Sequence, residues 1–312
     1  MSNHTRFAFV VWGLCLSLSS TTAQESAFSS PTTLKPDARS TIVDPAESLS
    51  GSRLRGREVA ERSEPKREEI ETDRDSFTPS TALTPRGRLI VESAYSFLDN
   101  RGFKETHSLP ELILRYGVNE RLELRFGWNA EIGGSGAEVS GNAGEGDPFE
   151  HEDKVEREHT ILYGAKFRIS GQDRLLPRSV LILQGYTPTG GSEGVSTASS
   201  VIATYAAGWE FANRWRLDGS MRYGFDSEKG DRFNDWAPSI VLKVPVGEKL
   251  AVHAEYFGIF TTKKEQNTNR QFFSPGLHAL VTPDLEIGFR LGWGLNDQSA
   301  RFIANAGIGW QY

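Results

Sequence analysis

Apolar and polar residues alternate along much of the second half of the chain. In residues 285–294 (LEIGFRLGWG) every second residue is large and apolar, and Glu286 and Arg290 lie between them. A period of two predicts a β-strand with one apolar and one polar face. In a soluble sandwich the apolar face would point to the core, whereas in a membrane barrel it would contact lipid and the polar face would line the lumen. One segment does not distinguish these two folds.

The pattern repeats after Pro85, and the repeats favour the barrel. The predicted strands are residues 88–98, 106–118, 121–130, 158–169, 178–187, 200–211, 214–226, 234–246, 249–260, 271–281, 285–295 and 301–312. Many are about ten residues long, the length at which a tilted strand crosses a bilayer. Longer and shorter links alternate between them, as in outer-membrane barrels, and the seven residues 227–233 count among the longer ones. We therefore predict an all-β fold, a twelve-stranded antiparallel transmembrane barrel over residues 87–312.

The aromatic residues support this fold class. Tryptophans fall on the apolar face near segment ends, where interfacial aromatic girdles lie. They are Trp128, Trp209, Trp215, Trp236, Trp293 and Trp310. The chain also has 31 glycines and only two methionines, a composition that suits strands and turns better than helices.

The N-terminal part of the chain differs in composition and lacks this alternation. Residues 7–18 (FAFVVWGLCLSL) are too short for a membrane-spanning helix, but they follow Arg6 and precede small residues at Thr21 and Ala23. We expect residues 1–23 to be a secretory signal peptide that is cleaved after Ala23. Residues 24–69 are rich in Ser, Pro, Arg and Glu without an apolar period, which predicts a disordered periplasmic leader. The lone Cys15 lies in the signal, so the mature chain would contain no cysteine.

The polar face of the predicted strands carries charges of both signs. The residues predicted to line the lumen are Glu92, Glu111, Arg115, Glu123, Arg125, Lys166, Arg168, Glu210, Arg216, Asp218, Arg222, Lys243, His253, Glu255, His278, Glu286 and Arg290. Because the signs nearly balance, we expect ion pairs between strands rather than a ring that selects one charge. His253 and His278 would pair directly if their hairpin were centred between residues 265 and 266. Side chains of this length could also fill a twelve-stranded barrel, and that alternative stays open.

Charge and motifs restrict the function. The net charge of −6, without a dominant basic patch, argues against nucleic acid as a partner. The acidic link that holds His151, Glu152, Asp153 and His159 has neither zinc-site nor calcium-loop spacing, so no metal is expected, and no motif indicates a cofactor. No histidine lies on the apolar face within a strand core, which speaks against a membrane hydrolase and against an enzyme in general.

Two stretches carry a family resemblance. The segments TDRDSFTPSTALTPRGRLIVESAYSF and HSLPELILRYGVNERLELRFGWN resemble the outer-membrane family named for a MetA pathway of phenol degradation, whose members are called transporters. That family has Thr-Asp-Arg-Pro before its first strand, and Asp75 replaces the proline here. The terminal Tyr312 is similar to the C-terminal assembly signal of outer-membrane barrels. The resemblance implies a bacterial outer-membrane location, membrane lipid and the outer-membrane assembly machinery as partners, and passage of small, hydrophobic or aromatic solutes.

The leading hypothesis is therefore non-enzymatic passage of a small, unidentified solute through the lumen. The rival is a filled barrel that serves as a structural or binding element through its external loops. The segment before the first strand, residues 70–86, bears on this choice because Asp73, Arg74 and Asp75 could pair with the charged lumen. Its residues 72–85 reach about 45 Å when extended, enough to enter a barrel with an apolar band of about 25 Å and act as a plug.

Overall fold

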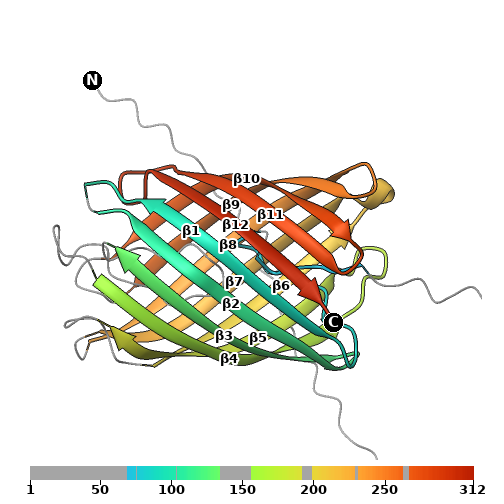
Figure 1. Ribbon diagram of the computed structural model, residues 1–312, viewed down its shortest axis with the longest axis horizontal. Helices are drawn as coiled ribbons and strands as arrows, with labels where there is room; N and C mark the ends of the chain where they lie inside the picture. The colour runs from blue at the N-terminus through green and yellow to red at the C-terminus, as the bar shows by residue number, and fades with distance from the viewer. Residues whose placement is uncertain are drawn as a thin grey trace, which may run out of the picture. The chain divides into compact units, whose positions relative to one another are not determined.

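The computed structural model describes residues 69–312, except residues 75, 103, 134–155, 192–198, 229–230 and 263–266. The predicted signal peptide and all of the predicted leader except Glu69 lie outside the described residues. Twelve antiparallel strands form one closed barrel (Figure 1). They are β1 (Leu89–Asp99), β2 (Thr106–Asn119), β3 (Leu122–Gly133), β4 (Glu156–Ser170), β5 (Arg178–Gly191), β6 (Ser200–Glu210), β7 (Arg216–Glu228), β8 (Asp231–Val246), β9 (Leu250–Thr262), β10 (Asn269–Thr282), β11 (Leu285–Gly294) and β12 (Phe302–Gln311).

Each strand pairs with its neighbours in sequence, and β1 closes the barrel on β12. The closing register joins Ile90 to Gln311 and Asp99 to Phe302, so the whole length of both strands is paired. A short 3-10 turn, Ala212–Arg214, connects β6 to β7. The predicted fold class and strand count are confirmed, and each strand begins and ends within four residues of its predicted bounds.

The two faces of each strand are inverted relative to a soluble sandwich. In β11, Glu286 and Arg290 are 4% and 2% exposed, whereas Ile287, Phe289 and Trp293 are 43–44% exposed on the outer surface. The same alternation runs along β2, where the residues from Thr106 to Gly117 alternate between buried and more exposed sides with one irregularity. Charged and polar side chains therefore predominate inside the barrel, and apolar residues cover the outside, as lipid contact requires.

One feature of the links differs from the sequence prediction. Residues 227–233 were expected to form a long link, but β7 continues to Glu228 and β8 begins at Asp231. The two strands pair up to Glu228 and Asp231, so polar residues at the strand ends extend the ladder beyond the apolar pattern that defined the predicted bounds. The alternation of long and short links is broken at this hairpin. Separately, the described residues include no helix that is long and apolar enough to cross a membrane.

Candidate functional site

The segment before β1 lies inside the barrel. We call residues 70–86 the inserted segment, and we call the barrel end at which β1 begins the proximal end. The N–H of Ile70 donates to the carbonyl of Pro283, in the β10–β11 turn at the proximal end (2.9 Å). Arg86 forms a bridge with Gly117, near the β2–β3 turn at the same end. The inserted segment therefore enters and leaves the lumen through one opening and forms a loop.

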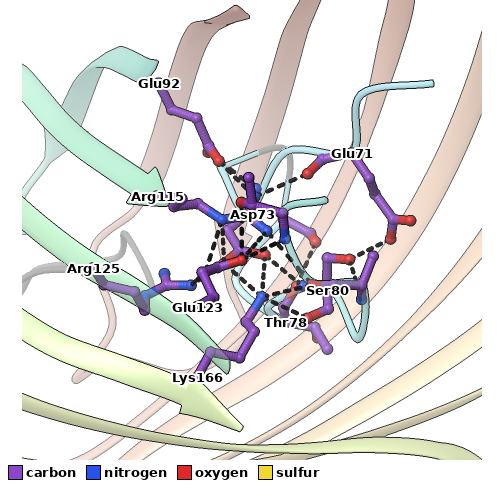
Figure 2. A network of polar contacts seen from close by, with 12 residues as sticks. Glu71, Asp73, Thr78, Ser80, Glu92, Arg115, Glu123, Arg125 and Lys166 are labelled. Carbon is purple, nitrogen blue, oxygen red and sulfur yellow. Dashed lines mark hydrogen bonds and ion pairs between the residues drawn. The ribbon is translucent and has the colours of Figure 1, made fainter. Parts of the chain in front are cut away.

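Asp73 anchors this loop to the barrel wall. Its carboxylate lies 2.5 Å from the guanidinium of Arg125 and 2.9 Å from the ammonium of Lys166. Arg115 is 3.7 Å away. Figure 2 shows these three cations, from β2, β3 and β4, pointing toward Asp73. All four side chains are fully buried, so one carboxylate of the inserted segment gathers three cations of the wall.

Wall carboxylates complete the network around Asp73. Glu92 accepts a hydrogen bond from the Asp73 N–H (3.0 Å) and pairs with Arg115 (2.7 Å). Glu123 pairs with Arg115 and Arg125, each at 3.0 Å, and accepts the N–H of Thr84 (2.8 Å). Burial alone would raise the pKa of Asp73, but the three surrounding cations outweigh it and hold that pKa well below its usual range. Asp73 is therefore ionised at neutral pH.

Further polar contacts hold the residues on either side of Asp73. Arg74 pairs with Glu111 of β2 (2.7 Å), and the Thr72 hydroxyl donates to Glu286 of β11. Glu71 pairs with Arg216 of β7 at the proximal rim. There it borders a cavity of about 180 Å³ between the inserted segment and the β8–β9 turn. Asp75, the third residue predicted to act in the plug, lies outside the described residues.

The inner turn of the loop, residues 76–80, inserts one aromatic ring, that of Phe77, into the lumen. The Phe77 ring is 2% exposed and belongs to a buried cluster inside the barrel. The other members of that cluster are Leu98, Ala237, Phe257, Ile259, Phe272, Ala300 and Ile303. Leu98 and Ile303 face each other near the end of the barrel opposite the proximal end. The lumen thus has a charged network around Asp73 in its proximal half and, beyond it, an apolar cluster that lies beside buried charged side chains such as Arg222.

The structure places most of the predicted lumen residues inside the barrel. Thirteen of the seventeen are buried: Glu92, Glu111, Arg115, Glu123, Arg125, Lys166, Asp218, Arg222, Lys243, His253, Glu255, Glu286 and Arg290. Arg168, Arg216 and His278 are partly exposed toward the strand ends. Glu210 is exposed at the proximal rim, on the same face of β6 as the buried Thr204 and Ala206. It is the last residue of β6, and its carbonyl accepts a hydrogen bond from Gln172 at the rim (2.8 Å).

The hairpin centre that would pair His253 directly with His278 does not occur. His253 lies opposite Gly276, and His278 lies opposite Ala251, so the hairpin register differs by two residues. The two rings are still diagonal neighbours, with centroids 6.4 Å apart. A shift of two preserves the face of every side chain, which explains why the lumen assignment survives the register error.

Sequence reasoning missed the apolar part of the lumen because it considered only the charged positions. Phe257 and Ile259 lie on the same inner face as His253 and Glu255. The signal was present in the sequence as EYFGIF, where apolar residues occupy both parities and the alternation is lost. Within the described part of the chain, no three or more His, Cys, Asp and Glu residues are grouped so that they could hold a metal ion.

The fold and lumen define an outer-membrane-type β-barrel. Residues 72–312 match the family described as "Putative MetA-pathway of phenol degradation", and the chain belongs to that family. The resemblance seen in the sequence is thereby confirmed.

Solved structures share the fold at low identity. An outer membrane channel from Pseudomonas putida F1 is 14% identical, with 78% of this chain and 100% of that chain covered and a TM-score of 0.50. The NanC porin is 9% identical (71% and 98% covered, TM-score 0.45). The translocator domain of the autotransporter NalP from Neisseria meningitidis is 13% identical (72% and 88% covered, TM-score 0.43). No curated protein matches the chain.

Proposed function

We propose that the protein is an outer-membrane channel for small apolar or aromatic molecules and that the inserted segment is its removable plug. The observation that carries this proposal is how the plug is held. Among the described residues of the inserted segment, only Arg86 forms a bridge to a strand of the barrel. Apart from the hydrogen bond from the Ile70 N–H to the Pro283 carbonyl in a turn, the others are held by ion pairs, side-chain hydrogen bonds and packing. The segment can therefore withdraw without breaking the strand pairing that closes the barrel.

The character of the lumen supports the solute class. Beyond the Asp73 network, the inner wall presents Leu98, Phe257, Ile259, Phe272 and Ile303, all buried. A solute with an apolar body would gain free energy there from leaving water, at about 25 cal/mol per Å² of apolar surface. The family description, which refers to phenol degradation, agrees with this class of solute.

The proposal includes an orientation and a route of assembly. The proximal end faces the periplasm, because the signal peptide and leader precede the inserted segment, whose first described residues lie at that end. Export uses a cleaved signal peptide (residues 1–23), and the outer-membrane assembly machinery inserts the barrel beside membrane lipid. Passage requires no catalytic residue and no cofactor.

The alternative is a filled barrel with a structural or binding role. It is favoured by the complete burial of Arg115 and Lys166 together with Asp73, because such a network is costly to open. In this case the inserted segment would be a permanent part of the core. The external loops would then carry the function.

Deletion of residues 24–84, with the signal peptide retained, tests these alternatives. We expect the folded yield to be unchanged and the single-channel conductance in planar bilayers, or the uptake of small solutes into liposomes, to rise. If both forms conduct equally, the inserted segment is not the barrier. If neither form conducts, the channel proposal fails and the filled barrel stands.

A further inference from the structure

The Phe77 ring occupies a slot in the barrel wall that is built from aromatic and charged side chains. It stacks on Phe257 of β9 with a centroid distance of 4.3 Å and an interplanar angle of 6°. Phe257 stacks in turn on Phe272 of β10 (4.8 Å, 20°). The guanidinium carbon of Arg222, from β7, lies 4.9 Å from the centre of the Phe77 ring. Stacking and a cation over the ring face both favour an aromatic group over an aliphatic one of the same size.

A buried carboxylate lies at the edge of this slot. Glu255 accepts hydrogen bonds from the N–H of Phe77 (2.9 Å) and from the N–H and hydroxyl of Thr78 (each 2.7 Å). Arg290 lies 3.5 Å from the same carboxylate. If the inserted segment withdraws, Glu255 loses these three hydrogen-bond donors while it stays inside the barrel. A ligand that supplies a donor would replace the hydrogen bonds that Glu255 makes to the inserted segment.

We infer that the slot formed by Phe257, Phe272, Arg222 and Glu255 is a binding site for a small aromatic solute that carries a hydroxyl or amino donor, and that Phe77 occupies this site in the plugged state. The inference rests on the proposed channel function and names its solute site. The ring of the solute takes the place of the Phe77 ring, and its donor takes the place of the Phe77 and Thr78 donors at Glu255.

This arrangement couples solute binding to plug release. The solute and Phe77 compete for one site, so the solute binds only the form in which the inner turn of the loop has moved away. A ligand that binds one of two forms shifts the equilibrium toward that form in proportion to its concentration. An aromatic solute therefore promotes its own passage, whereas a polar solute of the same size does not.

Replacement of Phe77 by alanine in the full chain tests the site directly. The purified F77A barrel is titrated with phenol and with cyclohexanol, which has nearly the same size and the same hydroxyl but no aromatic ring, and binding is followed by ligand-observed NMR. We expect F77A to bind phenol saturably and about tenfold more tightly than the unmodified protein, because the competing ring is gone. Cyclohexanol should bind F77A more weakly than phenol does. Phe257→Leu, added to F77A, should abolish the preference for phenol.

Leu83→Ala is the matched control. Leu83 also belongs to the inserted segment, but it packs against the aliphatic cluster of Val180, Ile182 and Ala206. This variant should leave phenol binding at the level of the unmodified protein. If F77A does not fold, Phe77→Leu keeps the apolar volume without the aromatic ring and should still bind phenol more tightly than the unmodified protein.

Equal binding of phenol and cyclohexanol by F77A, or an equal gain in phenol binding in Leu83→Ala, would overturn the inferred site. The binding assay and the conductance assay separate the two proposals. If the barrel conducts after deletion of residues 24–84 but F77A shows no preference for phenol, the channel proposal is supported and the inferred binding site is contradicted. If F77A prefers phenol but neither form of the barrel conducts, the inferred binding site is supported and the channel proposal is contradicted.

Discussion

The Asp73 carboxylate lies 2.9 Å from the ammonium group of Lys166, although the two residues are 93 positions apart in the chain. Lys166 also donates to the carbonyls of Ser80 (3.0 Å) and Ala82 (3.1 Å) in the returning half of the loop. One wall lysine therefore holds both halves of the inserted segment. Since Arg115 and Arg125 converge on the same carboxylate, Asp73 is the residue whose loss should most weaken docking of the segment.

Asp73→Asn keeps the shape of the side chain and removes its charge. Removal of one partner from a buried ion pair costs about 3–5 kcal/mol, because the remaining charges stay buried without it. We expect the barrel to fold, the inserted segment to become accessible to a protease, and the conductance to increase. Asp99→Asn is the control, because Asp99 pairs with Arg301 at an exposed site (3.4 Å), where such a pair contributes at most about 1 kcal/mol. Similar behaviour of the two variants would contradict the role of Asp73.

The pH dependence of docking follows from the lowered pKa of Asp73. The stabilisation from an ionised carboxylate with a depressed pKa is complete above its unfolded value, which is about 3.9, and is lost as the pH falls through the lower folded value. We therefore expect the conductance of the unmodified protein to stay constant between pH 7 and about pH 5. An opening transition near pH 6, in planar bilayers buffered at each pH, would show that another group controls the inserted segment.

The inversion of the strand faces predicts opposite tolerance at two adjacent residues. Phe289 is 43% exposed on the outer face of β11, whereas Arg290 is 2% exposed inside the barrel. Phe289→Arg should impair assembly, because arginine on the lipid face costs about 2–4 kcal/mol near the bilayer midplane. Arg290→Leu should assemble better, although the loss of its contact with Glu255 should loosen the inner turn of the inserted segment. Equal folding yields of the two variants in lipid vesicles would refute this assignment of faces.

The sequence predicted the faces of the strands well because a period of two is a local property. Glu286 and Arg290 are assigned to the lumen by their neighbours alone, and a register shift of two residues, as at His253, does not change the assignment. The ends of the strands were harder to predict. Polar residues such as Asp231 continue the pairing of β7 and β8 without an apolar pattern, and Glu210 ends its strand at an exposed rim.

The contacts of the inserted segment could not be predicted from the sequence. The charges of Asp73 and Arg74 suggested that this segment could enter the lumen, but their partners come from strands that only the closed barrel brings together. The sequence pattern predicts no role for Phe77, because a single aromatic residue in a polar stretch belongs to no apolar period. Its role depends on Phe257, 180 positions further along the chain, and only the register of β9 places the two rings face to face.

The strand order also predicts which links are accessible from outside the cell. Asn119 ends β2 at the proximal end, and the β3–β4 link, which contains Gly144 and lies outside the described residues, joins two strands at the opposite end. A protease site inserted at Gly144 should be cleaved on intact cells, whereas one inserted at Asn119 should be protected until the outer membrane is permeabilised. Cleavage at Asn119 in sealed cells would reverse the proposed orientation.

A close approach between Gly309 and Thr72 gives the most local test of docking. Gly309 lies on the inner face of β12, and a Cβ atom there would lie 2.3 Å from the Thr72 methyl group and 3.4 Å from the side chain of Ile70. Thr72 is β-branched and its hydroxyl donates to Glu286, so it cannot rotate away without losing that hydrogen bond.

Gly309→Ala should therefore push the first half of the inserted segment off the wall, at a cost of about 1–3 kcal/mol, while the strand itself accepts alanine. Gly292→Ala is the matched control, because Gly292 is buried on the inner face of the neighbouring β11 and a Cβ atom there would meet its nearest neighbours at 3.5 Å, an ordinary contact. We expect faster proteolysis of the inserted segment and higher conductance for Gly309→Ala, and no change for Gly292→Ala. If both variants match the unmodified protein, Thr72 does not rest against β12, and the inserted segment follows a different path through the lumen.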